Sequence, residues 1–164
     1  MKQTLLSQKS ILKICIALLT TAIICFLSLA LTKAVCSDER EHLYATFATY
    51  SGKIPYRDFF EHHHPLLWYI GSLFLYINDN TPYIWYTLRI FMVIVTLTTS
   101  FFIYKISKIQ QLSTPLSIIG ATIYLSLYEV KYSGLEYRPD NLMMLFFTSG
   151  LYFFLSYLKK TKPY

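Results

Sequence analysis

A nearly uninterrupted apolar run from residue 11 to residue 32 (ILKICIALLTTAIICFLSLALT) most restricts the folds open to this 164-residue chain. As a helix, the run is about 33 Å long, enough to cross a hydrocarbon core of about 30 Å. A secretory signal peptide is the alternative, because lysines precede the run and Ala34-Val35-Cys36 resembles a small-residue cleavage site. The apolar stretch exceeds the roughly 7–15 residues of a signal-peptide core, which favours a retained anchor.

Three further apolar runs, at 83–104, 114–130 and 141–158, are read as membrane spans. Residues 65–77 are also apolar, but as a helix they reach only about 20 Å and are expected to lie at the membrane surface or re-enter it. With 54% hydrophobic residues the chain is too apolar for a soluble domain. These patterns predict an all-α integral membrane protein with four spans, and with external juxtamembrane amphipathic helices inside the segment 33–82.

The lysines predict the orientation of these spans. If residues 65–77 do not cross, one side of the membrane holds eight lysines and no acid, while all nine Asp and Glu residues lie on the other. The positive-inside rule then places the amino terminus in the cytoplasm, and the segment 33–82 and the loop ending at Asp140 on the external face of the plasma (inner) membrane. Because the cations flank apolar runs and form no basic stripe, the net charge of +6 does not indicate nucleic-acid binding.

Three acids are candidate catalytic residues on this external face: Asp38, Glu39 and Asp140. Adjacent carboxylates raise one another's pKa, and burial adds to the effect, which suits a general base. The alternative for the pair is a solvated helix start, with Asp38 as the cap and Glu41 completing a capping box. Asp140 follows Arg138 and Pro139 where a span begins, so it also fits a helix cap.

Basic residues on the same face are candidates for binding a phosphate. Arg89 lies about two turns inside the span 83–104, where a charge needs a partner or must reach the membrane surface. The other candidates, for which ordinary surface charge is the alternative, are Arg57, Lys131 and Arg138. Glu61, His62 and His64 are candidate ligands of a divalent metal ion, although consecutive histidines rarely all bind one ion.

The order of these motifs resembles the amino-terminal part of GT-C class membrane glycosyltransferases, particularly bacterial relatives of protein O-mannosyltransferases and aminoarabinose transferases. The likeness runs from about residue 11 to the end of the chain. The matching residues are Asp38-Glu39, Gly52-Lys53-Ile54-Pro55-Tyr56-Arg57-Asp58-Phe59-Phe60, His64-Pro65, Arg89 and Arg138-Pro139-Asp140.

The resemblance implies transfer of a sugar from a polyprenyl-phosphate donor to an acceptor on the outer membrane face. It implies that Asp38 is the base or acceptor-positioning acid, that Asp140 lies near the same pocket, and that Glu61 corresponds to a metal ligand of some relatives. Members of this class have many more spans, so the chain is expected to be an amino-terminal fragment or one part of a split enzyme, inactive alone. The alternatives are a four-span helper or lipid-binding subunit, and a small transporter, which would need ionisable groups at mid-membrane.

Overall fold

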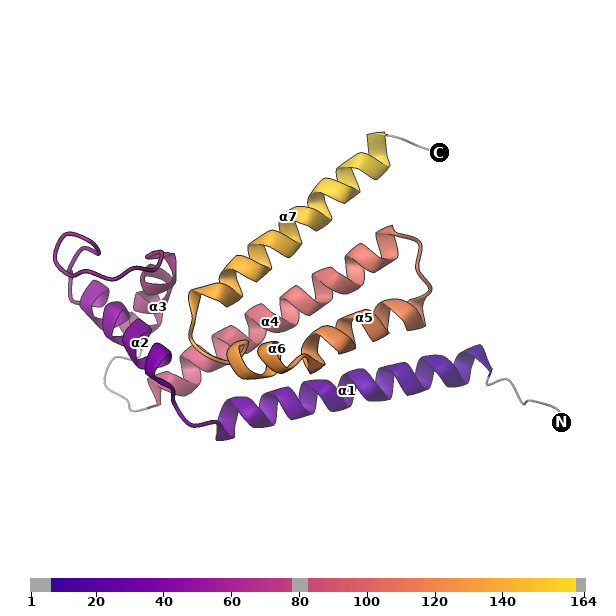
Figure 1. Cartoon of the computed structure of the whole chain (residues 1–164), viewed down its shortest axis with the longest axis horizontal. Coiled ribbons are helices and arrows are strands. Elements are labelled where there is room, and N and C mark those ends of the chain that lie inside the picture. The colour runs from indigo at the N-terminus through magenta and orange to yellow at the C-terminus, as the bar shows by residue number, and fades with distance from the viewer. Residues whose placement is uncertain (1–6, 78–82, 162–164) are drawn as a thin grey trace.

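The computed structural model describes residues 7–77 and 83–161, and within them the chain is helical with no strand. The turn predicted at 78–82 lies outside the described residues. Seven helices follow one another in these two ranges: α1 (Gln8–Thr32), α2 (Ser37–Tyr50), α3 (Leu66–Ile77), α4 (Ile84–Ile109), α5 (Thr114–Ser126), α6 (Tyr128–Ser133) and α7 (Pro139–Thr161). Figure 1 shows α1, α4, α5 and α7 forming an elongated bundle, with α2 and α3 at one end of it.

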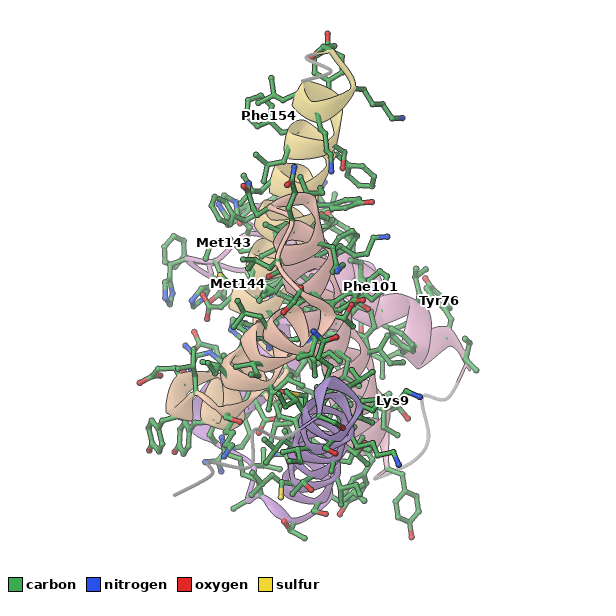
Figure 2. All side chains as sticks on the ribbon, turned by 90° about the vertical axis from the view of Figure 1, so that its right-hand side faces the viewer. Lys9, Tyr76, Phe101, Met143, Met144 and Phe154 are labelled. Carbon is green, nitrogen blue, oxygen red and sulfur yellow. The ribbon has the colours of Figure 1, made fainter. Side chains whose placement is uncertain are left out.

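Three of the helices, α1, α4 and α7, are long and apolar enough to cross a membrane. α4 packs along α7, and α5 packs against both α1 and α4. Most apolar side chains of α7 are exposed, among them Met143 and Phe154, which are labelled in Figure 2. Such an apolar exterior suits a helix surrounded by hydrocarbon.

The fourth predicted span, residues 114–130, is not one continuous helix. α5 ends at Ser126, Leu127 takes an extended conformation (φ −59°, ψ 139°), and α6 begins at Tyr128. The thirteen residues of α5 therefore reach about 20 Å, less than the thickness of a hydrocarbon core. The break redirects the chain, so that the Gly134 carbonyl accepts a 2.8 Å hydrogen bond from Thr96 of α4.

The helices α2 and α3 pack against each other, and their shared core is continuous with the start of α4. Trp68 of α3 is fully buried there, and the predicted apolar face of α2, which carries Leu43 and Phe47, contributes to the same cluster. α2 ends at Tyr50, close to Gly52, whose φ of 85° favours glycine.

The predicted capping box of α2 has the wrong register. The helix begins at Ser37 with Cys36 as its N-cap, and Glu39, not Glu41, accepts a 3.2 Å hydrogen bond from the Cys36 backbone N–H. Asp38 is consequently the second residue of the helix and does not cap it. The shift matters because it turns Glu39 inwards.

Candidate functional site

A buried ion pair joins the start of α2 to α4. The Arg89 Nε and Nη2 atoms donate to the two carboxylate oxygens of Glu39 at 2.8 and 2.6 Å, and neither side chain is more than 4% exposed. The remaining three N–H groups of the guanidinium donate to backbone carbonyls at the end of α1, those of Ala30, Lys33 and Ala34. All five donors of an arginine are thereby used.

This geometry bears on two of the predicted roles. Glu39 is enclosed and neutralised by Arg89, so in this arrangement it is not placed to act as a general base. Arg89 neither snorkels to the surface nor has a donor left for a phosphate. The pair instead fixes α1, α2 and α4 relative to one another.

A second ion pair, between Lys33 and Glu136, lies beside the first. Glu136 is 1% exposed, and the Lys33 ammonium also lies 3.5 Å from the centroid of the Tyr132 ring. This pair ties the end of α1 to the segment between α6 and α7. Sequence analysis missed it because both residues stand in loops, where a charge is usually solvated.

Arg138 brings together the two predicted acids that are not enclosed. Its guanidinium lies 3.1 Å from Asp38 and 3.3 Å from Asp140, and also 3.3 Å from Glu136. The convergence of Asp38 and Asp140 that the topology predicts is therefore present. Burial lowers the pKa of Arg138, but the three carboxylates outweigh it and raise the pKa above its ordinary value. The side chains of Asp38 and Asp140 are 46% and 56% exposed, so both can be reached by a substrate.

A mostly apolar cavity of about 410 Å³ opens next to this group, with Asp140 in its wall. It lies between the segment that begins α3 and the first turns of α7. Its lining residues are His62, His63, His64, Leu66, Leu67, Pro139, Asp140, Leu142, Met143 and Phe146. The cavity thus combines an apolar wall with a few titratable groups, as binding sites for amphipathic ligands do.

The histidine segment forms a cluster that differs from the predicted metal ligands. Glu41, Glu61, His62 and His63 each present a ligand atom, and these atoms lie within 4.8 Å of one another. Glu61 and His62 were predicted; Glu41 and His63 were missed, and His64 is not in the group. Burial raises the pKa of Glu61, but hydrogen bonds from the His63 ring and backbone, both 2.7 Å, bring it below its ordinary value.

Behind the cluster lies a buried histidine that the sequence did not single out. His42 is 1% exposed, its Nδ1 accepts a hydrogen bond from the Trp68 indole at 3.5 Å, and its ring stands edge-on to that of His63. Burial, followed by the neighbouring His63, lowers the pKa of His42 to about 4. The imidazole is therefore neutral at physiological pH and packs as part of the α2–α3 core.

Comparison with known proteins bears on this arrangement of acids and cavity. The family model described as dolichyl-phosphate-mannose-protein mannosyltransferase matches residues 62–164, which is more than half of the chain. The chain belongs to this mannosyltransferase family. No curated protein and no solved structure matches it. Together with the three apolar helices, membership identifies a multi-pass membrane protein with a mannosyltransferase-like character.

The region that matches the family model includes only one of the two exposed acids that contact Arg138. Arg138 and Asp140 lie inside the matched region, whereas Asp38 and Glu39 precede it. The contacts of Arg138 are therefore what connect the amino-terminal acid to the part of the chain that matches the mannosyltransferase family.

The two remaining predicted phosphate ligands do not line the cavity of this family member. Arg57 is 66% exposed and donates two 2.8 Å hydrogen bonds to its neighbour Asp58, whose pKa the pairing lowers to about 2. Lys131 lies in α6 and is absent from the cavity wall. Of the four predicted cations, Arg138 is the one that contacts both exposed acids.

Proposed function

We propose that the chain takes part in sugar transfer from a polyprenyl-phosphate donor to an acceptor on the extracytoplasmic face of the plasma (inner) membrane. The observation that carries the proposal is the bridge from Asp38 through Arg138 to Asp140 at a largely apolar cavity. Membership of the mannosyltransferase family supplies the class of reaction. The apolar wall suits the lipid part of a donor, and the exposed acids can accept hydrogen bonds from the hydroxyls of its sugar.

In the proposed reaction Asp38 is the general base. Its carboxylate takes the proton of an acceptor hydroxyl as the acceptor oxygen bonds to the anomeric carbon of the sugar. The bond from that carbon to the phosphate oxygen breaks, and the polyprenyl phosphate leaves with the electron pair. Arg138 orients Asp38 and Asp140 and offers positive charge near the leaving group.

The charged side chains around Arg138 carry a net negative charge, which one further cation would neutralise. Asp38, Glu136 and Asp140 face Arg138 and Lys33, which leaves one net negative charge once the neutral Glu39–Arg89 pair is set aside. An anionic donor would be repelled by such a group unless a further positive charge came with it. His62 and His63 of the neighbouring cluster line the same cavity as Asp140.

We therefore propose that Glu41, Glu61, His62 and His63 hold a divalent ion, for which mixed imidazole and carboxylate ligands favour Zn²⁺. Such an ion would supply positive charge for the donor phosphate. Purified full-length chain in detergent is expected to retain one equivalent of Zn²⁺ after dialysis, measured by elemental analysis. His63→Asn should weaken Zn²⁺ binding at least about tenfold.

His64→Asn is the matched control, because His64 is the neighbouring histidine that stands outside the cluster, and it should bind Zn²⁺ as the unaltered chain does. Equal losses of Zn²⁺ binding in the two variants would show that the ion is not bound by the cluster of Glu41, Glu61, His62 and His63. No retained metal in the unaltered protein would contradict the proposed ion.

We also propose that the segment 110–138 provides a fourth, interrupted crossing. α7 begins beside the first half of α4, since the Asn141 amide nitrogen lies 3.6 Å from the Met92 sulfur. The chain must therefore return along α4 after Ile109, over about 26 Å. α5 covers about 20 Å of this distance, and Leu127 and α6 cover the rest. This topology places α2, α3 and Arg138 together outside the membrane.

Cysteine labelling tests this orientation. In spheroplasts, a membrane-impermeant maleimide is expected to label the native Cys36 and not a cysteine introduced by Ser107→Cys. Cys36 is half-buried, and burial raises the pKa of its thiol, so the reaction should be run above neutral pH. Tyr44→Cys, at a position that is 65% exposed on α2, provides an accessible external control. Labelling of Ser107→Cys alone would reverse the topology.

The transfer itself is tested with polyprenyl-phosphate [³H]mannose as the probe, in native membranes, which hold the chain together with any other part of a split enzyme. The proposal expects more radioactive product than in membranes from cells that lack the chain. Binding of the probe by the chain with an unchanged amount of product would instead favour a lipid-binding helper subunit, and would contradict a role of the chain in transfer.

A further inference from the structure

Tyr137 connects the elements that carry the two exposed acids. Its side chain is fully buried between α2 and α3, where the hydroxyl lies 2.9 Å from the Thr46 hydroxyl and donates to the Leu67 carbonyl at 2.9 Å. Its backbone N–H points to Glu39 at 3.4 Å. Burial raises the pKa of Tyr137, so the hydroxyl keeps its proton at neutral pH. One residue thus contacts α2 twice and α3 once.

The fit of the Tyr137 ring depends on a glycine in α3. A Cβ atom at Gly71 would lie 1.9 Å from the Tyr137 hydroxyl oxygen and 2.8 Å from the Thr46 methyl carbon. Contacts this short are excluded, so any side chain at position 71 must displace the tyrosine, the helix or both. The close approach of α3 to Tyr137 is therefore specified by sequence at two positions 66 residues apart.

The hydrogen bonds at this contact are also restrictive. The Thr46 hydroxyl lies 2.7 Å from the His42 carbonyl as well as 2.9 Å from the Tyr137 hydroxyl. Two hydroxyl protons are shared among these three short contacts, the third being the one to Leu67, so that two of the three are hydrogen bonds at any one time. All these atoms are buried, and a buried polar group that loses its partner is costly. The contact therefore has little freedom to slide.

The ion pairs of Arg138 are weaker constraints on position. Asp38 and Asp140 are both about half exposed, and exposed ion pairs contribute little to stability because water screens the charges. They come from helices that begin about a hundred residues apart. Arg138 directly follows Tyr137, so the orientation of Arg138 depends on how firmly that tyrosine is seated.

We propose that Tyr137 is a positioning residue that holds the α2–α3 pair against the start of α7 and thereby sets the separation of Asp38 and Asp140. Tyr137 does not line the cavity, so it acts through its neighbours and not on a substrate. The expected effect on catalysis rests on the proposed function, because only two acids that serve one reaction need to keep a fixed separation. A misplacement of about 1 Å at such a site lowers the rate by about 10²-fold.

The geometric test uses spin labels on the two elements. Labels are attached at Tyr44→Cys on α2 and Phe147→Cys on α7, both exposed positions, in the full chain with its native cysteines replaced by serine. Tyr137→Phe removes the hydroxyl and keeps the ring, and is expected to broaden or shift the measured distance distribution. Gly71→Ala, which places a methyl group of α3 against the Tyr137 hydroxyl, should also broaden or shift the distribution. Tyr69→Phe, at a half-exposed tyrosine of α3, should leave the distribution unchanged.

The kinetic test uses transfer from polyprenyl-phosphate [³H]mannose in the same membranes. Tyr137→Phe is expected to lower kcat by about 10- to 100-fold while the KM for the donor stays within about twofold. If Tyr137→Phe only reduced the amount of folded protein, the active fraction would fall, but the spin-label distance distribution of the protein that remains folded would not broaden.

The outcomes separate the inference from the proposed function. An unchanged distance distribution in Tyr137→Phe overturns the positioning role, whatever the activity, and this variant decides alone if Gly71→Ala does not fold. A changed distribution with undiminished kcat shows that the separation does not matter for transfer, and also overturns it. A changed distribution in a chain that transfers nothing supports the positioning contact and contradicts the proposed function.

Discussion

Replacement of Arg89 by leucine is expected to destabilise the protein by about 3–5 kcal/mol, the range found when one member of a buried ion pair is removed. Glu39 would remain enclosed without a partner, and three carbonyls at the end of α1 would lose their donors. For a chain of this size the loss corresponds to a fall in Tm on the order of 10 °C. Thermal aggregation of the detergent-solubilised protein, followed by size-exclusion chromatography, measures it.

Two variants make the result specific to the buried pair. The double variant Glu39→Gln with Arg89→Leu should recover part of the lost stability, because the uncompensated charge is gone although the carbonyls still lack donors. Arg57→Leu removes an exposed arginine that pairs only with its neighbour, and should change Tm little. If Arg89→Leu were as harmless as Arg57→Leu, the role assigned to the pair would be wrong.

The second large effect concerns Asp38, for which Asp38→Asn is expected to lower mannose transfer by about 10²–10⁴-fold. An amide cannot take the acceptor proton, whereas its size and exposure are close to those of the carboxylate. Asp38 is 46% exposed and does not cap α2, so the fold should persist and the protein should still insert into membranes. Transfer from polyprenyl-phosphate [³H]mannose, normalised to the amount of inserted protein, is the measurement.

Glu129→Gln provides a matched change at an exposed acid of α6 that lies outside the bridge formed by Asp38, Arg138 and Asp140, and it should leave transfer unaltered. Asp140→Asn should also reduce transfer, since Asp140 shares Arg138 with Asp38 and stands in the cavity wall. An unchanged rate for Asp38→Asn would remove Asp38 from the role of base and leave Asp140 as the remaining exposed candidate.

The sequence could predict which acids meet, but not which of them faces inwards. The charge count of the loops placed Asp38 and Asp140 on one side of the membrane, and Arg138 does join them. Asp38 and Glu39 looked alike because they are adjacent. Neighbours on a helix point about 100° apart, so one of the pair can be buried while the other is exposed. The register of α2, which begins two residues earlier than the capping pattern indicated, decided the outcome.

Other parts of the site depend on tertiary contacts that no local pattern records. The position of Arg89 inside an apolar segment did indicate that this charge needs a partner or must reach the membrane surface, and the structure pairs it with Glu39. No sequence pattern indicated the contacts of Lys33, Glu136 and Tyr137, because each of these residues stands in a short loop, where polar residues are common. The apolar run after residue 114 likewise gave no warning of the break at Leu127, where a bond from the Lys131 amide to the Leu127 carbonyl starts α6.

The contacts of Arg89 have a consequence for biosynthesis. The carbonyls of Ala30, Lys33 and Ala34 lie at and just beyond the end of the first helix, yet their donor lies more than fifty residues later in the chain. A nascent chain therefore emerges before these carbonyls have their donor, and unpaired carbonyls are costly near hydrocarbon. The end of α1 must stay in water or in the translocation machinery until α4 arrives. Tyr137 is made later still, so its contact with the α2–α3 pair can form only after the chain has been synthesised as far as residue 137.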